Sequence, residues 1–111
     1  MNTKQLESLL VLSKEFASLE LSNYILADTL LKLKKLSKTI DKYNVIACER
    51  TLTESEAKAQ DRAEAKAHKI GEEVLKCKVY ICSDARGLPI GLYLPSGRYN
   101  SFDGETWRKD Y

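Results

Sequence analysis

The residues able to bind a metal or act as a nucleophile are few in this sequence and stand far apart. Cys48, Cys77, Cys82 and the single histidine, His68, are the potential zinc ligands. A structural zinc site brings its ligands in pairs about two to four residues apart, and this chain lacks two such pairs. Cys77 continues a helical apolar pattern and Cys82 falls in an expected strand. Both are therefore interpreted as small buried hydrophobic residues, and no metal site is expected.

Candidate catalytic residues are equally few. His68 lies in an alanine-rich, charged stretch in which the sequence places no nucleophile or acid partner beside it. Asp84, Asp103, Glu105 and Asp110 are candidate acids or ligands, but turns account for two of them. None of the glycines opens a helix, so a phosphate-binding loop is not expected. The sequence predicts a non-enzymatic protein without a cofactor.

Tyrosines and arginines in the last third of the chain form the main candidate for a binding surface. The alternation of the expected strands puts Tyr80, Tyr93 and Tyr99 on one face of a sheet, with Arg98 and Arg108 nearby. A tyrosine combines an apolar ring with a polar tip and is enriched where proteins bind one another. These five residues are the predicted contact surface for a protein partner, whose identity the sequence does not give.

A lysine-rich segment supports an alternative class of partner. Lys32, Lys34, Lys35, Lys38 and Lys42 lie close together in sequence but are spread round a helix, as on an ordinary solvated face. In the alternative interpretation they contact phosphates while the tyrosine and arginine face stacks nucleotide bases. The net charge of +2 is small for a nucleic-acid-binding protein. A protein partner is therefore preferred over nucleic acid.

The elements that would position these residues begin with a long helix. From Leu6 to about Ala47 the chain has no Gly or Pro and repeats apolar residues at helical spacing. One helix is expected over residues 1–50, with Ser18 to Asn23 as the place where it can kink. The main seam reads Leu9, Leu12, Phe16, Leu19, Asn23, Leu26, Leu30, Leu33, Ser37, Ile40, Asn44 and Ala47, and a second stripe beside it contains Leu6, Leu10, Ala17, Tyr24, Ala27 and Leu31.

A helix with so wide an apolar face needs a partner. A second helix, expected over residues 53–78 and begun by a capping box at Thr53 and Glu56, runs antiparallel to the first. Its alanine-lined inner face buries little area, so part of the first helix stays uncovered. This surplus predicts a coiled-coil-like homodimer. The residues assigned to self-association are Leu12, Phe16, Leu19, Leu26, Leu30 and Leu33.

The remaining stretch, residues 79–109, is typical of a β-meander of three or four antiparallel strands. All Gly and Pro residues lie after residue 70, and turn signals stand at 84–87, 94–97 and 103–104. Loops at 84–87, 95–97 and 103–104 predict which side chains share a face. The predicted core face holds Val79, Ile81, Ile90, Leu92, Leu94, Phe102 and Trp107, and the exposed face holds Tyr80, Cys82, Gly91, Tyr93, Tyr99, Ser101, Thr106 and Arg108.

The predicted fold is therefore a single α+β domain: a helical hairpin followed by a C-terminal meander. The composition, 43% hydrophobic and 31% charged, is that of a globular protein. The apolar runs are too short for a membrane span or a signal peptide, so a cytoplasmic location without membrane association is expected. The predicted function is to bind or inhibit another protein complex, a role that would suit a small accessory protein of a virus or mobile element.

Overall fold

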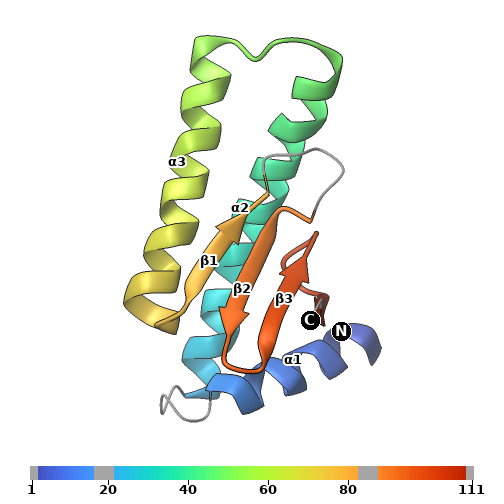
Figure 1. Cartoon of the computed structure of the whole chain (residues 1–111), viewed down its shortest axis with the longest axis vertical. Coiled ribbons are helices and arrows are strands. Elements are labelled where there is room, and N and C mark those ends of the chain that lie inside the picture. The colour runs from blue at the N-terminus through green and yellow to red at the C-terminus, as the bar shows by residue number, and fades with distance from the viewer. Residues whose placement is uncertain (1–2, 17–21, 83–87, 110–111) are drawn as a thin grey trace.

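The structure is a computed structural model and describes residues 3–16, 22–82 and 88–109. Its helices precede its strands, and the strands form one antiparallel sheet that packs on the helices (Figure 1). This is the predicted α+β fold with a C-terminal β-meander. In chain order the elements are α1 (Thr3–Phe16), α2 (Asn23–Glu49), α3 (Glu54–Ile70), the π-helical turn η2 (Gly71–Leu75), β1 (Lys78–Ile81), β2 (Ile90–Leu94), β3 (Gly97–Ser101) and β4 (Trp107–Lys109).

The N-terminal helical region is two helices rather than one. α1 ends at Phe16, α2 begins at Asn23, and α1 lies across the lower end of α2 instead of continuing it (Figure 1). Ser22 caps α2 because its hydroxyl accepts a hydrogen bond of 3.1 Å from the N–H of Ile25. The prediction of one helix over residues 1–50 was therefore wrong. The break falls in the predicted kink region, of which residues 17–21 lie outside the described part of the chain.

The turn between α2 and α3 is built by a capping box, as predicted. The hydroxyl of Thr53 accepts from the N–H of Glu56 at 3.2 Å, and the Glu56 carboxylate accepts from the N–H of Thr53 at 2.9 Å. Arg50 adds two hydrogen bonds of 2.8 Å to the same carboxylate. The buried side chains of Ala63 and Ala67 are small, which allows α2 and α3 to pack closely as an antiparallel pair.

The second helix ends in a π-helical turn that packs closely against the first strand. α3 stops at Ile70 and passes into η2, which Lys76 ends with a left-handed φ of 53°. A Cβ atom at Gly71 would lie 2.3 Å from Cγ2 of Val79, so a side chain there would push η2 away from β1. The expected second helix over residues 53–78 therefore comprises α3 and η2, with β1 beginning at Lys78.

The strands follow one another in the order β1-β2-β3-β4. The predicted pairing of β1 with β2 is confirmed, because Val79 lies opposite Leu92 and Ile81 lies opposite Ile90. These four side chains face the helices, and Ile90 and Leu92 are fully buried. Hydrophobic alternation on both strands excluded a one-residue shift, which would have turned one apolar face to solvent.

The pairing of β2 with β3 differs from the prediction by one residue. Leu94 pairs with Gly97 rather than with Arg98, because the loop contains only residues 95–96. Gly97 has a φ of 142° and already belongs to β3. Such a backbone conformation favours glycine. Every β3 side chain from Arg98 onward consequently points to the face opposite the predicted one.

This shift changes the environment of three predicted residues. Tyr99, predicted on the exposed face, lies opposite Leu92 and is only 5% exposed. Ser101 is likewise buried, whereas Phe102, predicted in the core, is 47% exposed in the loop before β4. Trp107 is buried as predicted, because it pairs with Ser101 instead of Asn100 and this second one-residue shift cancels the first.

The hydrophobic core lies between the α2–α3 hairpin, α1 and the inner face of the sheet. The seam residues predicted to mediate self-association are part of it: none of the five that are described is more than 8% exposed. Their assignment to a dimer interface is corrected, because α1 and the sheet cover the seam within one chain. These five are Leu12, Phe16, Leu26, Leu30 and Leu33, and Leu19 lies outside the described residues.

Two polar residues of the seam anchor the sheet to α2. The Ser37 hydroxyl donates a hydrogen bond of 2.6 Å to the carbonyl of Phe102, and the Asn44 amide donates one of 3.2 Å to the carbonyl of Cys82. Gln60 of α3 donates to the Asn44 side-chain oxygen at 2.8 Å. These buried polar groups therefore position the sheet on the helices.

Among the described helices, none combines the length and apolar content needed to cross a bilayer.

Candidate protein-binding face

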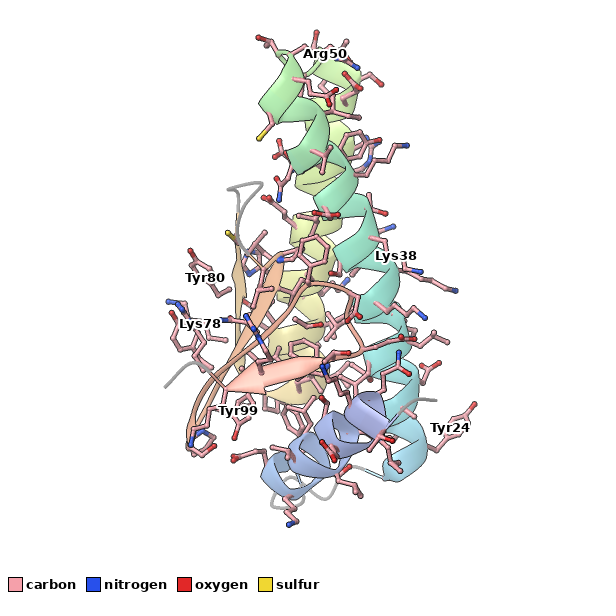
Figure 2. The ribbon with its side chains drawn as sticks, turned by 90° about the vertical axis from the view of Figure 1, so that its right-hand side faces the viewer. Tyr24, Lys38, Arg50, Lys78, Tyr80 and Tyr99 are labelled. Carbon is pink, nitrogen blue, oxygen red and sulfur yellow. The ribbon has the colours of Figure 1, made fainter. Side chains whose placement is uncertain are left out.

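The outer face of the sheet points away from the helices. The hairpin packs behind the sheet and α1 lies below it, so no described helix covers this face (Figure 1). Lys78 and Tyr80 project from it on the side opposite α2 (Figure 2). The strand pairing places seven residues on this outer face: Lys78, Tyr80, Gly91, Tyr93, Arg98, Asn100 and Arg108.

A cluster of aromatic and cationic side chains occupies this face. The rings of Tyr80 and Tyr93 contact edge to face, with 6.4 Å between centroids and 84° between planes. Lys78 Nζ lies 5.9 Å from the Tyr93 ring centroid, and Arg98 Cζ lies 5.5 Å from that of Tyr80. Each ring therefore has a cation over it at the distance of a cation–π contact. The contacts connect the four side chains across β1, β2 and β3.

The charge of the face is of one sign. Lys78, Arg98 and Arg108 are cationic, and none of the seven outward strand residues is acidic. Tyr80 and Tyr93 are 41% and 40% exposed, so both rings remain available to a partner. Exposed tyrosine with arginine is the composition that dominates the energetics of protein interfaces.

Gly91 and the Asn100 amide lie next to this cluster on the outer face. A Cβ atom at Gly91 would be 2.5 Å from the side-chain oxygen of Asn100, so glycine leaves the space that this amide occupies. Asn100 is only 6% exposed although it lies on the outer face. Sequence analysis missed Asn100 because the shifted register had placed it opposite Leu92.

Four of the five residues predicted to bind a partner meet on this face: Tyr80, Tyr93, Arg98 and Arg108. Tyr99 does not, because its ring lies in the core. Its hydroxyl is 2.9 Å from that of Ser96 and donates to Glu15 of α1 at 3.4 Å. Tyr99 therefore joins β3 to α1. Lys78 was missed, although its position two residues before Tyr80 in an alternating strand is a usable signal.

The lysines of the lysine-rich segment of α2 do not form one common surface. Lys34 forms an ion pair with Glu105, and Lys32 forms one of 3.2 Å with Asp28. Lys38 projects on the side of the molecule opposite Tyr80 (Figure 2). Lys38 and the tyrosine face therefore lie on opposite sides of the molecule.

A groove of about 410 Å³ runs between α2 and α3. Two lysines of the predicted segment and two lysines of α3 line it, and three apolar side chains and one glutamate complete the lining. Its basic character arises from the antiparallel packing of the two helices, which no local sequence pattern could indicate. The lining residues are Lys32, Lys35, Leu36, Lys66, Lys69, Ile70, Glu73 and Val74.

The cysteines are separate from these surfaces. Cys48 is exposed, whereas Cys77 and Cys82 are half-buried, and the three are free thiols. Burial raises the pKa of Cys77 to about 11, so its thiol stays protonated at neutral pH and is a poor nucleophile. Within residues 3–16, 22–82 and 88–109, no three His, Cys, Asp or Glu side chains are grouped to hold a metal ion.

The fold and this face together define a small α+β protein with an open, cationic and aromatic sheet surface. Comparisons with protein-family models, with curated proteins and with solved structures find no match for the chain. Its function must therefore be inferred from the chemistry of the surface itself.

Proposed function

We propose that this protein is a non-enzymatic interaction module that binds an acidic segment of another protein on the outer face of its sheet. The observation that carries the proposal is the cation–aromatic cluster of Lys78, Tyr80, Tyr93 and Arg98. Carboxylates of a partner would pair with the cations, and its apolar groups would pack on the exposed edges of the rings. Binding of this kind is the means by which the module would inhibit or recruit a larger complex in the cytoplasm.

The arrangement of the rings favours a protein over a single-stranded nucleic acid. Base stacking requires open ring faces, ideally on platforms that successive bases can reach together. Here one face of Tyr93 is occupied by Lys78, one face of Tyr80 is occupied by Arg98, and the two rings are 84° apart. The cluster therefore suits carboxylates and aliphatic side chains better than consecutive bases.

Nucleic-acid binding remains a second candidate function, supported by a different surface. Lys32, Lys35, Lys66 and Lys69 line one groove and could follow a phosphate backbone. Because no described tyrosine lines this groove, such binding would rest on charge without base stacking. It would weaken steeply with salt, which anisotropy measurements with labelled oligonucleotides would detect.

Site-specific photo-cross-linking tests the main proposal. A photoreactive phenylalanine analogue is placed at position 93, and the protein is irradiated in an extract of the organism that encodes it. A matched control carries the analogue at position 45, where Val45 of α2 is 48% exposed. The proposal predicts one dominant protein adduct from position 93 that is absent from position 45.

A charge reversal then separates specific from incidental cross-linking. Arg98→Glu should abolish the adduct at position 93, because it places a carboxylate where the partner's acidic group would bind. An adduct that persists in Arg98→Glu, or the same adduct from both positions, would contradict the proposal.

A further inference from the structure

Apolar side chains outside the core gather where α1 meets α2. Leu6 and Leu10 of α1 are 49% and 56% exposed, and Tyr24 and Leu31 of α2 are 83% and 50% exposed. All four belong to the second stripe beside the helical seam, whose described members are exposed. Figure 2 shows Tyr24 projecting from the lower end of α2, beside α1. An uncovered apolar surface of this kind marks an interaction site.

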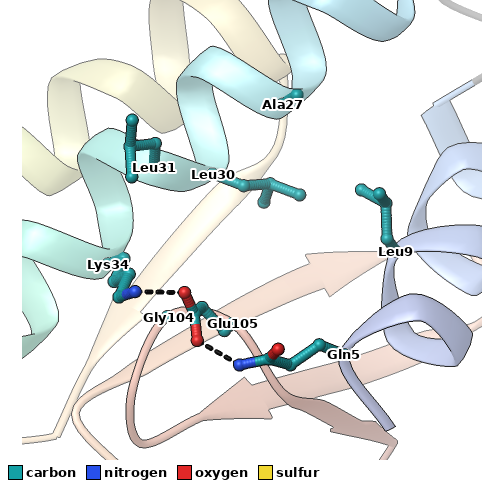
Figure 3. A pocket seen from close by; sticks show the side chains of 8 residues that line it. All are labelled: Gln5, Leu9, Ala27, Leu30, Leu31, Lys34, Gly104 and Glu105. Atoms are coloured by element: carbon teal, nitrogen blue, oxygen red, sulfur yellow. Dashed lines mark hydrogen bonds and ion pairs between the residues drawn. The ribbon is translucent and has the colours of Figure 1, made fainter. Parts of the chain in front are cut away.

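A groove of about 350 Å³ lies between the two helices at this surface (Figure 3). Leu9 of α1 and Leu30 of α2 point into it. Lys34 and Glu105 form an ion pair on one side of the groove, and Gln5 donates a hydrogen bond to the same carboxylate. The groove therefore has an apolar interior and a polar wall that is already satisfied within the chain.

We propose that a second copy of this chain binds in this groove and forms a two-fold symmetric dimer. Leu6 and Leu10 form a ridge on α1 next to the groove that α1 shares with α2. A two-fold axis lets the ridge of each copy enter the groove of the other, so one contact buries both exposed surfaces. The groove and the ridge are thus complementary parts of a single self-binding surface.

The charges on the exposed face of α1 favour this occupant. Glu7 lies three residues before Leu10 and Lys14 lies four residues after it, so the three residues share a helix face. When two α1 helices pair antiparallel about an axis beside Leu10, Glu7 of each copy faces Lys14 of the other. Parallel pairing would instead bring like charges together. The charge pattern therefore selects the antiparallel, two-fold arrangement.

The exposed patch is of the kind that often forms an interface. The largest apolar patch on a monomer is typically about 300–600 Å² and is often functional. A contact through Leu6, Leu10, Tyr24 and Leu31 uses the second stripe, whereas the described seam residues stay in the core.

Sedimentation equilibrium of the full chain tests the proposal. Across micromolar concentrations the wild type should populate a reversible dimer of twice the 12.6 kDa chain mass. Leu10→Glu should raise the dimer dissociation constant at least about tenfold, because it buries a charge at the centre of the contact. Leu31→Lys, also at an exposed position, serves as a second variant should Leu10→Glu disturb folding. Val45→Glu is the matched control, since Val45 is 48% exposed near the other end of α2 and should not affect the dimer.

A charge swap tests the orientation. Glu7→Lys alone should weaken the dimer, and Glu7→Lys combined with Lys14→Glu should restore it, because the reciprocal contacts are re-formed with opposite sign. A wild-type monomer at every concentration would overturn the proposal and leave the groove to a helix of another protein. Equal weakening by Leu10→Glu and Val45→Glu, or no rescue by the swap, would also contradict it.

Discussion

The hydroxyl of Ser8 in α1 bonds both backbone polar groups of Trp107 in β4. It accepts from the Trp107 N–H at 3.1 Å and donates to the Trp107 carbonyl at 3.3 Å. β4 is an edge strand, and the free polar groups of an edge strand invite pairing with another chain. Because Ser8 is buried, α1 satisfies and covers this edge where β4 begins. The sheet is therefore better suited to binding through its outer face than by strand addition at Trp107.

Removing this hydroxyl should destabilise the fold. Ser8→Ala leaves two buried backbone groups of Trp107 without a partner, which should lower the free energy of unfolding by about 1–3 kcal/mol. Ser13→Ala is the control, because Ser13 donates only to the carbonyl of Leu9 within α1. Its effect should stay within about 0.5 kcal/mol. Urea denaturation of both variants gives the comparison, and equal effects would show that Ser8 does not hold β4.

The position of Tyr99 makes a second prediction. Tyr99→Ala removes a buried ring and should cost about 3–5 kcal/mol of unfolding free energy, as for other buried aromatic residues. Tyr93→Ala removes a half-exposed ring and should cost no more than about 1 kcal/mol. Thermal or urea unfolding measures both. Two small losses of similar size would instead agree with the register predicted from the sequence, in which both tyrosines are exposed.

The comparison of these tyrosines shows where sequence reasoning reached its limit. Alternating apolar residues defined the pairing of Val79 with Leu92, because a one-residue shift would have moved the apolar side chains of one strand to the solvent face. β3 has the sequence Gly-Arg-Tyr-Asn-Ser, in which no apolar alternation fixes the face. Its register depends on whether Gly97 lies in the loop or in the strand, and glycine suits both. A one-residue error there exchanged the faces of Tyr99 and Arg98.

The helical region shows a second limit. The apolar spacing continues through Phe16 and into Leu26 because α1 and α2 contribute to the same core. Periodicity therefore could not distinguish a continuous helix from two helices that cross. The buried seam was predicted correctly, and so was its packing against the second helix and the sheet. The surplus apolar area was assigned to a second copy of the chain, whereas in the structure the described seam residues are buried within one chain. Sequence reasoning still identified most of the candidate site, since Arg108, Tyr80 and Tyr93 lie on strands whose faces were assigned correctly.

The loop before β4 gives a third prediction. Gly104 has a φ of 77°, and a Cβ atom there would lie 2.1 Å from Cα of Lys34 in α2. Gly104→Ala should therefore destabilise the protein by about 2–4 kcal/mol through backbone strain and a clash with α2. Lys34→Ala is the control, because it removes only the ion pair with Glu105, and this loss should lower the free energy of unfolding by no more than about 1 kcal/mol. Calorimetry on both variants measures the two losses. A Gly104→Ala variant as stable as the wild type would contradict the packing of this loop against α2.

Acid titration of Glu56 gives a fourth prediction. Hydrogen bonds from Arg50, followed by that from the Thr53 N–H, lower the pKa of Glu56 from 4.5 to about 2. Because the folded pKa lies below the unfolded one, the contribution of Glu56 to stability is complete above pH 4.5 and is lost as the pH falls towards 2. Carboxyl NMR titration should show this low midpoint. Arg50→Gln should move it back towards the ordinary value, and an unchanged midpoint would refute the role of Arg50.

The most direct test of the central claim is the affinity of the purified protein for the partner that cross-links at position 93. Isothermal titration should show that Arg98→Glu raises the dissociation constant at least about tenfold, because a buried interfacial charge is reversed. Lys66→Glu, in the groove between α2 and α3, should change the dissociation constant less than about twofold. A larger increase of the dissociation constant for Lys66→Glu than for Arg98→Glu would place the binding surface on the helices. It would contradict the assignment of function to the outer face of the sheet.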